Sequence, residues 1–218
     1  MLEVANLECV RGNRRLFRDV SFALPRGTLL QLSGANGSGK TSLLRILCGL
    51  LSPASGEVRW QGTAIRELAE DYARNVTYIG HRHGIKEELT SLENLQISSA
   101  MAGFKVDREE ARTALERLGL SGRENLPARF LSEGQRRRSA LARLLTCDTD
   151  VWLLDEVLAS LDRAASVLIE SLVGEHLDKG GIAIVATHQE LHISANAFQR
   201  LELESGATSR VLSSASTT

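Results

Sequence analysis

The sequence lacks paired cysteines, a long apolar run and an excess of either charge. Cys9, Cys48 and Cys147 are odd in number and form no Cys-x-x-Cys pair, which argues against a disulfide framework or a zinc site and suits a reducing compartment. The apolar stretch 43–51 is shorter than the roughly 18 residues of a membrane span and contains Arg45. The first residues, MLEVANLE, have no basic cap before an apolar core, so we expect no secretory signal. We therefore expect a protein that does not span a membrane, although it can lie on one.

The charge balance and the length are those of an ordinary globular protein. Lys and Arg total 26 against 27 Asp and Glu, a formal net charge of −1, so we expect no nucleic-acid partner. Hydrophobic residues make up 43% and charged residues 24% of the chain, far from a disordered composition. The 218 residues fit one domain, or one domain with a small inserted lobe.

Short apolar runs alternate with helical patterns over most of the chain. Four runs look like strands buried on both faces: 29–33, 76–79, 151–154 and 182–186. Weaker strand patterns suggest an antiparallel β edge near the N-terminus: 2–8, 20–24 and 57–60. The alternation predicts an α/β fold whose core is a mainly parallel sheet.

The stretch 90–145 breaks this alternation and is typical of consecutive helices. Thr90-Ser-Leu-Glu and Asp107-Arg-Glu-Glu each fit a capping box before helix-forming sequence. We therefore predict an α-helical lobe over 90–145, inserted into a core formed by 1–89 and 146–210. The Ser/Thr-rich end, 211–218, is predicted to be a frayed tail.

Residues 34–41, GANGSGKT, match the phosphate-binding pattern GxxxxGK[ST] at every position, between an apolar run and a helical pattern. The glycines let the backbone N–H groups turn inward, and the start of the helix adds partial positive charge. Lys40 is expected to reach the β- and γ-phosphates, and the Thr41 hydroxyl to bind Mg²⁺. The residues expected to hold the nucleotide are Gly34, Ala35, Asn36, Gly37, Ser38, Gly39, Lys40, Thr41 and Ser42. The loop alone does not distinguish a kinase, a GTPase and an ATPase.

Two carboxylates follow the apolar run 151–154. Asp155 suits a magnesium ligand, and Glu156 suits the general base that orients the attacking water. Adjacent strand residues point in opposite directions, but a bend at the strand end lets both face one site. A solvated turn explains most such pairs, so this interpretation depends on the phosphate-binding loop. His188 also follows a buried run, where it suits a hydrogen bond to the γ-phosphate.

The motif Leu131-Ser-Glu-Gly-Gln opens another predicted helix. Ser132 and Gln135 fit a capping box, and Gly134 allows a second backbone to approach closely. A helix N-terminus that carries a serine is also an anion site. Because the loop at 34–41 already holds one side of a nucleotide, Ser132, Gly134 and Gln135 are expected to contact the nucleotide of a second subunit. The arginines at 136–138 are either a solvated face or added positive potential near that phosphate.

These motifs together resemble the ATP-binding cassette (ABC) ATPases over almost the whole chain. The order is that of the family: the P-loop (Walker A) at 34–41, the signature LSEGQ at 131–135, Walker B at 151–156, a D-loop at 160–162 and a switch histidine, His188. The resemblance implies a P-loop NTPase fold with a RecA-like core. It also implies a head-to-tail homodimer that encloses two ATP molecules and hydrolyses them.

Several positions depart from the family pattern. Glu133 places a negative side chain in the signature motif, and Val157 replaces the proline that commonly follows Walker B. The aromatic residue expected to stack on adenine is missing, and Arg11 stands in that region instead. His81 holds the Q-loop position, where it is expected to sense the γ-phosphate and couple it to a partner subunit. A metal or haem site at His81 and His83 is disfavoured, since two histidines lack the further ligands such a site needs.

Three segments are similar to the ATP-binding subunits of bacterial cytochrome c maturation: 56–62, 80–95 and 180–191. That resemblance implies a peripheral subunit at the cytoplasmic face of the bacterial inner membrane, bound to integral membrane subunits. Its ATP turnover would serve haem export and the release of a haem-loaded periplasmic chaperone. The alternative is an ABC exporter of another substrate, such as a drug or lipid. A soluble member acting on ribosomes or DNA is disfavoured, because the chain has neither a second cassette nor a long coiled-coil insertion.

Overall fold

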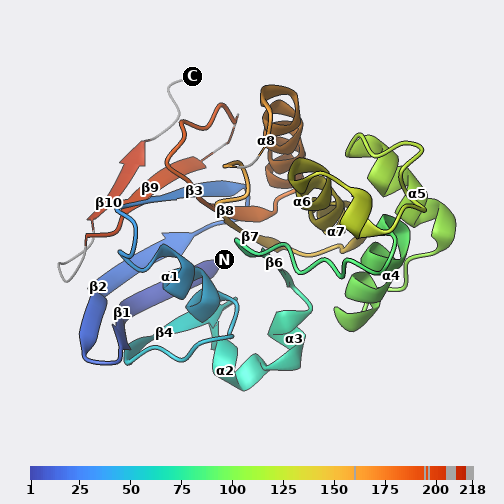
Figure 1. The fold of residues 1–218 in the computed structure, drawn as a ribbon. Helices are drawn as coiled ribbons and strands as arrows, with labels where there is room; N and C mark the ends of the chain where they lie inside the picture. Colours follow the sequence, from blue (N-terminus) through green and yellow to red (C-terminus); the bar gives the residue numbers. More distant parts are fainter. Residues whose placement is uncertain (160, 194, 196, 205–209, 215–218) are drawn as a thin grey trace.

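The computed structural model contains two β-sheets and two groups of helices (Figure 1), and it describes residues 1–159, 161–193, 195, 197–204 and 210–214. The smaller sheet has the order β2-β1-β4-β5 and is antiparallel. Its strands are β1 (Leu2–Arg11), β2 (Arg14–Leu24), β4 (Ser55–Trp60) and β5 (Thr63–Ala64). The predicted antiparallel edge near the N-terminus is therefore confirmed.

The larger sheet has the order β10-β9-β3-β8-β7-β6. Its strands are β3 (Thr28–Ser33), β6 (Val76–Ile79), β7 (Val151–Asp155), β8 (Ile182–Ala186), β9 (Ala197–Glu202) and β10 (Arg210–Ser214). All neighbouring pairs are parallel except β10 and β9, which are antiparallel. The prediction of a mainly parallel sheet is confirmed, and the four predicted apolar runs coincide with β3, β6, β7 and β8 to within a residue.

Successive residues of the central strands enter two different hydrophobic cores. In β8, Ile182 and Ile184 pack into the core shared with α1 (Lys40–Leu47) and the antiparallel sheet. Ala183 and Val185 of the same strand pack into the core shared with α8 (Arg163–Asp178) and the helical lobe. Because side chains alternate across a strand, a strand covered on both faces needs an unbroken apolar run. This explains why these strands could be recognised in the sequence.

Helices occupy the stretch where consecutive helices were predicted, at one end of the molecule in Figure 1. They are α4 (Ser91–Met101), α5 (Arg108–Arg117), α6 (Glu133–Leu141) and α7 (Arg143–Thr146), with a 3₁₀ turn at Ala128–Phe130. The capping boxes at Thr90, Asp107 and Ser132 are all formed. Two short helices, α2 (Ile65–Leu68) and α3 (Glu70–Ala73), connect β5 to β6. Within the described residues, no helix combines the length and apolarity that a membrane span requires.

The predicted tail at 211–218 is partly wrong. The backbone of Arg210–Ser214 forms β10, which pairs antiparallel with β9 in unbroken register from Arg210 opposite Glu202 to Ser214 opposite Phe198. A strand edge offers unpaired backbone groups that a following segment can satisfy, whatever its composition. Residues 215–218 lie outside the described part of the chain.

Two glycines, Gly56 within β4 and Gly62 in the turn that follows β4, offer a test of backbone crowding. Gly56 and Gly62 have φ values of +81° and +87°, but a Cβ on Gly56 would lie 2.4 Å from the carbonyl oxygens of Ala5 and Asn6, whereas one on Gly62 would meet nothing within 4 Å. We expect Gly62→Ala to cost about 1–2 kcal/mol of unfolding free energy for the left-handed backbone alone. Gly56→Ala should cost about 1–3 kcal/mol more, because β1 must move. Urea unfolding of both variants measures the difference, and equal losses would refute the crowding.

Candidate functional site

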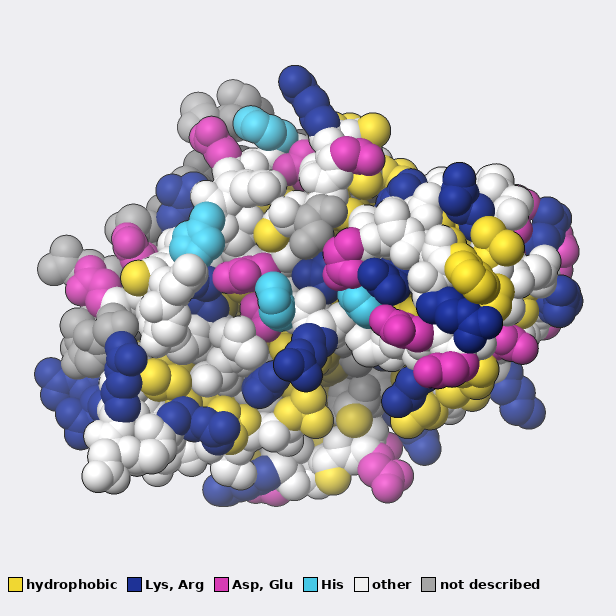
Figure 2. Space-filling view, viewed as in Figure 1, with side chains coloured by type: hydrophobic (Ala, Val, Ile, Leu, Met, Phe, Trp, Pro, Cys, Tyr) yellow, Lys and Arg dark blue, Asp and Glu magenta, His cyan; other side chains and the backbone are white. Residues whose placement is uncertain are grey.

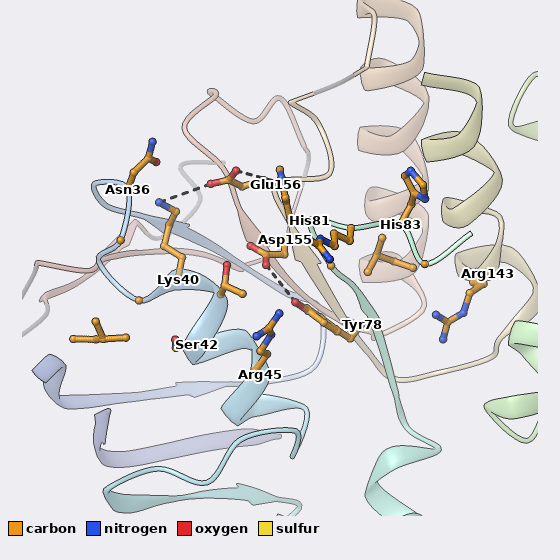
Figure 3. Close-up of a pocket in the computed structure, with 18 of the residues that line it drawn as sticks. Asn36, Lys40, Ser42, Arg45, Tyr78, His81, His83, Arg143, Asp155 and Glu156 are labelled. Atoms are coloured by element: carbon orange, nitrogen blue, oxygen red, sulfur yellow. Dashed lines mark hydrogen bonds and ion pairs between the residues drawn. The ribbon is translucent and has the colours of Figure 1, made fainter. Parts of the chain in front are cut away.

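The candidate site is a cavity of about 850 Å³ beyond the carboxyl ends of β6 and β7 and beside the loop that links β3 to α1. In a parallel sheet, the carboxyl ends of neighbouring strands meet at one edge, where ligands bind. Figure 2 shows His and acidic side chains near the centre of this face, with Lys and Arg side chains around them. Figure 3 shows that Lys40, Asp155, Glu156 and Tyr78 point toward one another within the cavity.

The P-loop curls around the ammonium group of Lys40. Gly34, Gly37 and Gly39 have φ values of +135°, +78° and +110°, which residues with a Cβ rarely adopt. Only 6% of Lys40 is exposed, and its Nζ donates hydrogen bonds to the carbonyl oxygens of Gly34 (2.7 Å) and Ala35 (3.3 Å). This loop therefore presents a buried positive charge beside the helix start, as phosphate binding requires.

The two strand-end carboxylates line the same cavity, as the bend predicted at the end of β7 requires. Glu156 has a left-handed backbone with φ +53°, and its N–H donates to the carbonyl oxygen of Ala186 at 3.0 Å. Its Oε1 lies 4.0 Å from Nζ of Lys40. Asp155 is 1% exposed and accepts a hydrogen bond of 3.3 Å from the hydroxyl of Tyr78. Burial, and then the charge of Asp155, raise the pKa of Tyr78, so this phenol remains a protonated donor.

The predicted histidines reach the site from two strands. His188 follows β8, and its Nε2 lies 3.3 Å from Nζ of Lys40, although its ring lines a neighbouring hollow. His81 follows β6, lines the cavity, and places Nδ1 3.9 Å from Oε2 of Glu156. The side chain of His81 is 72% exposed, so it lies at the mouth of the cavity and can meet a ligand from outside.

The signature residues do not join this cavity. Ser132 and Gln135 hydrogen-bond each other across the first turn of α6, and none of the three described residues Ser132, Gly134 and Gln135 lines the cavity. Their assignment to the nucleotide of a second subunit stays a prediction. Of the proposed D-loop, Ser160 lies outside the described residues, while Asp162 caps α8 by accepting a 2.8 Å hydrogen bond from the N–H of Ala165.

Several residues at the site were missed by the sequence analysis. Arg14 and Leu16, at the start of β2, line the cavity, whereas Arg11, which stands in the region of the missing adenine-stacking aromatic, is not among its lining residues. Arg14 and Leu16 carry no sequence signal, because the β1–β2 hairpin brings them to the P-loop from outside any motif. The sequence predicts Arg137 to be a solvated charge or a source of positive potential, but the residue is 3% exposed and donates a hydrogen bond to the backbone of Glu156 in Walker B.

The comparison with known families identifies the class of protein. Residues 17–159 match the model of the ABC transporter family, so the chain belongs to this family. A solved dimeric ATP-binding cassette, described as a post-hydrolysis state bound to ADP and Pi, superposes with a TM-score of 0.84 over 98% of both chains. The identity to that cassette is 22%, so this likeness concerns the fold alone. It confirms the predicted P-loop ABC fold class.

Curated relatives narrow the class further. The chain is 54% identical to the cytochrome c biogenesis ATP-binding export protein CcmA of Nitrosospira multiformis, over 93% of this chain and 98% of that protein. It is also 54% identical to the protein of the same name from Nitrosomonas europaea, over 93% and 95% of the two chains. The corresponding protein of Dechloromonas aromatica is 48% identical, over 93% of this chain and all of the relative. The chain therefore falls within the family of these export proteins.

Arg14 provides a test of where the adenine ring lies. With the phosphates at Lys40, we expect the base to contact Arg14 and Leu16. Arg14→Ala should then weaken ATP binding by about 2- to 30-fold, the range of a guanidinium stacked on a ring. Calorimetric titration with ATP measures this loss. Arg18→Ala is the matched control, because Arg18 belongs to the same strand but does not line the cavity. Equal affinities in the two variants would contradict the assignment.

Proposed function

We propose that this chain is the ATP-hydrolysing subunit of a membrane ABC complex for cytochrome c maturation, serving haem export and the release of a haem-loaded chaperone. The convergence of Lys40 and Glu156 at 4.0 Å supports the hydrolytic role, since a phosphate-binding cation and a candidate base face one cavity. The printed name of the relatives, cytochrome c biogenesis ATP-binding export protein, supports the physiological role.

In the proposed mechanism, the P-loop amides and Lys40 bind the β- and γ-phosphates. Glu156 aligns a water with the γ-phosphorus and accepts its proton as the new P–O bond forms and the bond to the β-phosphate oxygen breaks, giving ADP and phosphate. His188, beside Nζ of Lys40, donates a hydrogen bond to the γ-phosphate. The negative charge that develops on the transferred group is met by the buried ammonium of Lys40.

Thr41 and Asp155 are the proposed magnesium ligands. Both line the cavity, and they offer a hydroxyl and a carboxylate oxygen, the donors that Mg²⁺ prefers. Two protein ligands are few for an all-protein site but suit Mg²⁺, which usually keeps waters and substrate phosphates in its shell. The ion would neutralise charge on the phosphates. Tyr78, whose hydroxyl donates a hydrogen bond to Asp155, orients the carboxylate.

A second copy of the chain completes the proposed site. Ser132, Gly134 and Gln135 of one copy would contact the γ-phosphate held by Lys40 of the other, in a two-fold symmetric dimer. Ser132 is exposed at the start of α6, so its helix N-terminus is accessible to an anion. The matched solved cassettes are described as dimeric, which agrees with this proposal. The integral membrane subunits would then hold the dimer peripherally at the cytoplasmic face of the bacterial inner membrane.

Glu156→Gln tests the hydrolytic role. The amide cannot accept the proton of the attacking water, so we expect turnover to fall at least about 100-fold while ATP binding is kept. The variant should also accumulate as an ATP-bound dimer, because the closed state is no longer resolved by hydrolysis. Phosphate release and light scattering measure the two effects. Glu57→Gln, which changes a carboxylate of β4 that pairs with Arg59 outside this cavity, is the control. Turnover at the unmodified rate in Glu156→Gln would remove that residue from its role.

The physiological role is tested in cells whose only copy of the chain is Glu156→Gln. We expect haem-stained c-type cytochromes to be lost, because the proposed complex cannot turn over. Cells with Glu57→Gln should retain them. Purification in detergent should recover the chain with integral membrane proteins, identified by mass spectrometry. Normal cytochromes in the Glu156→Gln cells would instead favour an exporter of another substrate.

A further inference from the structure

Arg137 carries a charge in the interior, where an unsatisfied charge is costly. The residue lies in α6 and is 3% exposed. Burial lowers the pKa of its guanidinium, and the carboxylates of Glu133, Asp155 and Glu156 act in the opposite direction. Arginine has an intrinsic pKa so high that it stays charged even when buried. A residue of this kind needs compensating partners, and Arg137 has three backbone carbonyls.

The three carbonyls belong to two different segments of the site. Nη1 of Arg137 donates to the carbonyl oxygens of Gly80 (2.8 Å) and His81 (2.9 Å), which follow β6. Nη2 donates to the carbonyl oxygen of Glu156 at 3.0 Å. One planar group therefore connects the signature helix to the His81 segment and to the backbone of the proposed general base. The geometry uses the fixed fork of a guanidinium, which a lysine does not have.

The backbone of Glu156 needs such support. Its left-handed φ of +53° is unfavourable for a residue with a Cβ, and such conformations persist where the surroundings fix them. The N–H of Glu156 is held by the carbonyl of Ala186 in β8, and its carbonyl is held by Arg137 in α6. The orientation of the Glu156 carboxylate therefore depends on both the sheet and the signature helix.

The first turn of α6 holds the same loop by further contacts. Oε1 of Glu133 lies 3.4 Å from Nε2 of His83, and Arg136 pairs with Glu87 at 3.3 Å. A displacement of α6 would therefore move the 80–87 segment as well as the carbonyl of Glu156. Ser132, at the start of this helix, is the residue proposed to contact the nucleotide of the second copy.

We propose that Arg137 is a positioning residue for the carboxylate of Glu156. Through Arg137, the orientation of this carboxylate depends on contact between the signature helix and the nucleotide of the opposite copy. This inference rests on the proposed function and names the physical link between closure of the dimer and hydrolysis. Without the link, ATP still binds at the P-loop, but the general base is not held in line with the γ-phosphorus.

Arg137→Met and Arg138→Met provide a matched pair for the test. Arg138 follows in the same helix and donates to the carbonyl oxygens of Leu118 (3.2 Å) and Gly119 (3.3 Å) in the lobe, away from the site. In the detergent-purified membrane complex, we expect Arg137→Met to lower kcat at least about tenfold, since small misplacements of catalytic groups have large effects. KM and the Kd for ATP should stay within about twofold of the unmodified complex. Arg138→Met should leave all three within about twofold.

A double-mutant cycle with Ser132→Ala tests the coupling itself. Two independent effects multiply, whereas linked residues give a double variant about as slow as the slower single variant. Losses that multiply would overturn the link. Unchanged kcat in Arg137→Met would overturn it too, and so would a matching loss of ATP affinity, which would make Arg137 part of the nucleotide pocket.

Arg137→Lys keeps the positive charge, so it replaces Arg137→Met in the test if thermal melting shows that Arg137→Met is unfolded. It should be slow at unchanged Kd, because one ammonium cannot reproduce the planar fork. A full rate in Arg137→Lys would mean that charge alone suffices and would overturn the proposed geometry. If the unmodified complex bound ATP without hydrolysing it, the proposed function would fail first. The two failures are therefore distinguishable.

Discussion

The site is organised around the buried ammonium group of Lys40. Two P-loop carbonyls accept its hydrogen bonds, His188 approaches it from β8, and Glu156 approaches it from β7. A nearly buried cation needs such compensation, and a triphosphate would supply stronger compensation than carbonyl dipoles. The loop from β3, the strand ends of β7 and β8 and the start of α1 must therefore keep their relative positions. The rest of the fold holds these four elements in place.

The two hydrophobic cores provide that rigidity. β3, β7 and β8 send alternate side chains into opposite cores, so a strand cannot slide by one residue without exchanging the environments of all its side chains. The antiparallel sheet and α1 cover one face, and α8 with the lobe covers the other. The positions of Asp155 and His188, both at strand ends, follow from this register. Signature helix α6 belongs to the lobe, yet through Arg137 it also reaches the end of β7.

The sequence predicts what local pattern and chemistry determine. Buried strands, capping boxes and the P-loop are local, and they were found. Arg14 and Leu16 are brought to the cavity by a hairpin, which no local pattern encodes. Arg137 could have been found, because it precedes Ala140, Leu141 and Leu144 by three, four and seven positions, the spacing of one buried helix face. The tail was misjudged because composition does not record that β9 has an open edge.

Glu133, a departure from the family pattern in the signature motif, has two charged or titratable neighbours in the structure. This residue places a negative side chain in a motif that is expected to contact a triphosphate. Oε1 of Glu133 lies 3.4 Å from His83, and Oε2 lies 3.2 Å from the guanidinium of Arg136. Since arginine is charged at any physiological pH, the charge of Glu133 is compensated whether or not His83 is protonated. The acidic residue therefore helps to hold the helix start to the loop that leaves β6, and its repulsion of the phosphates is reduced.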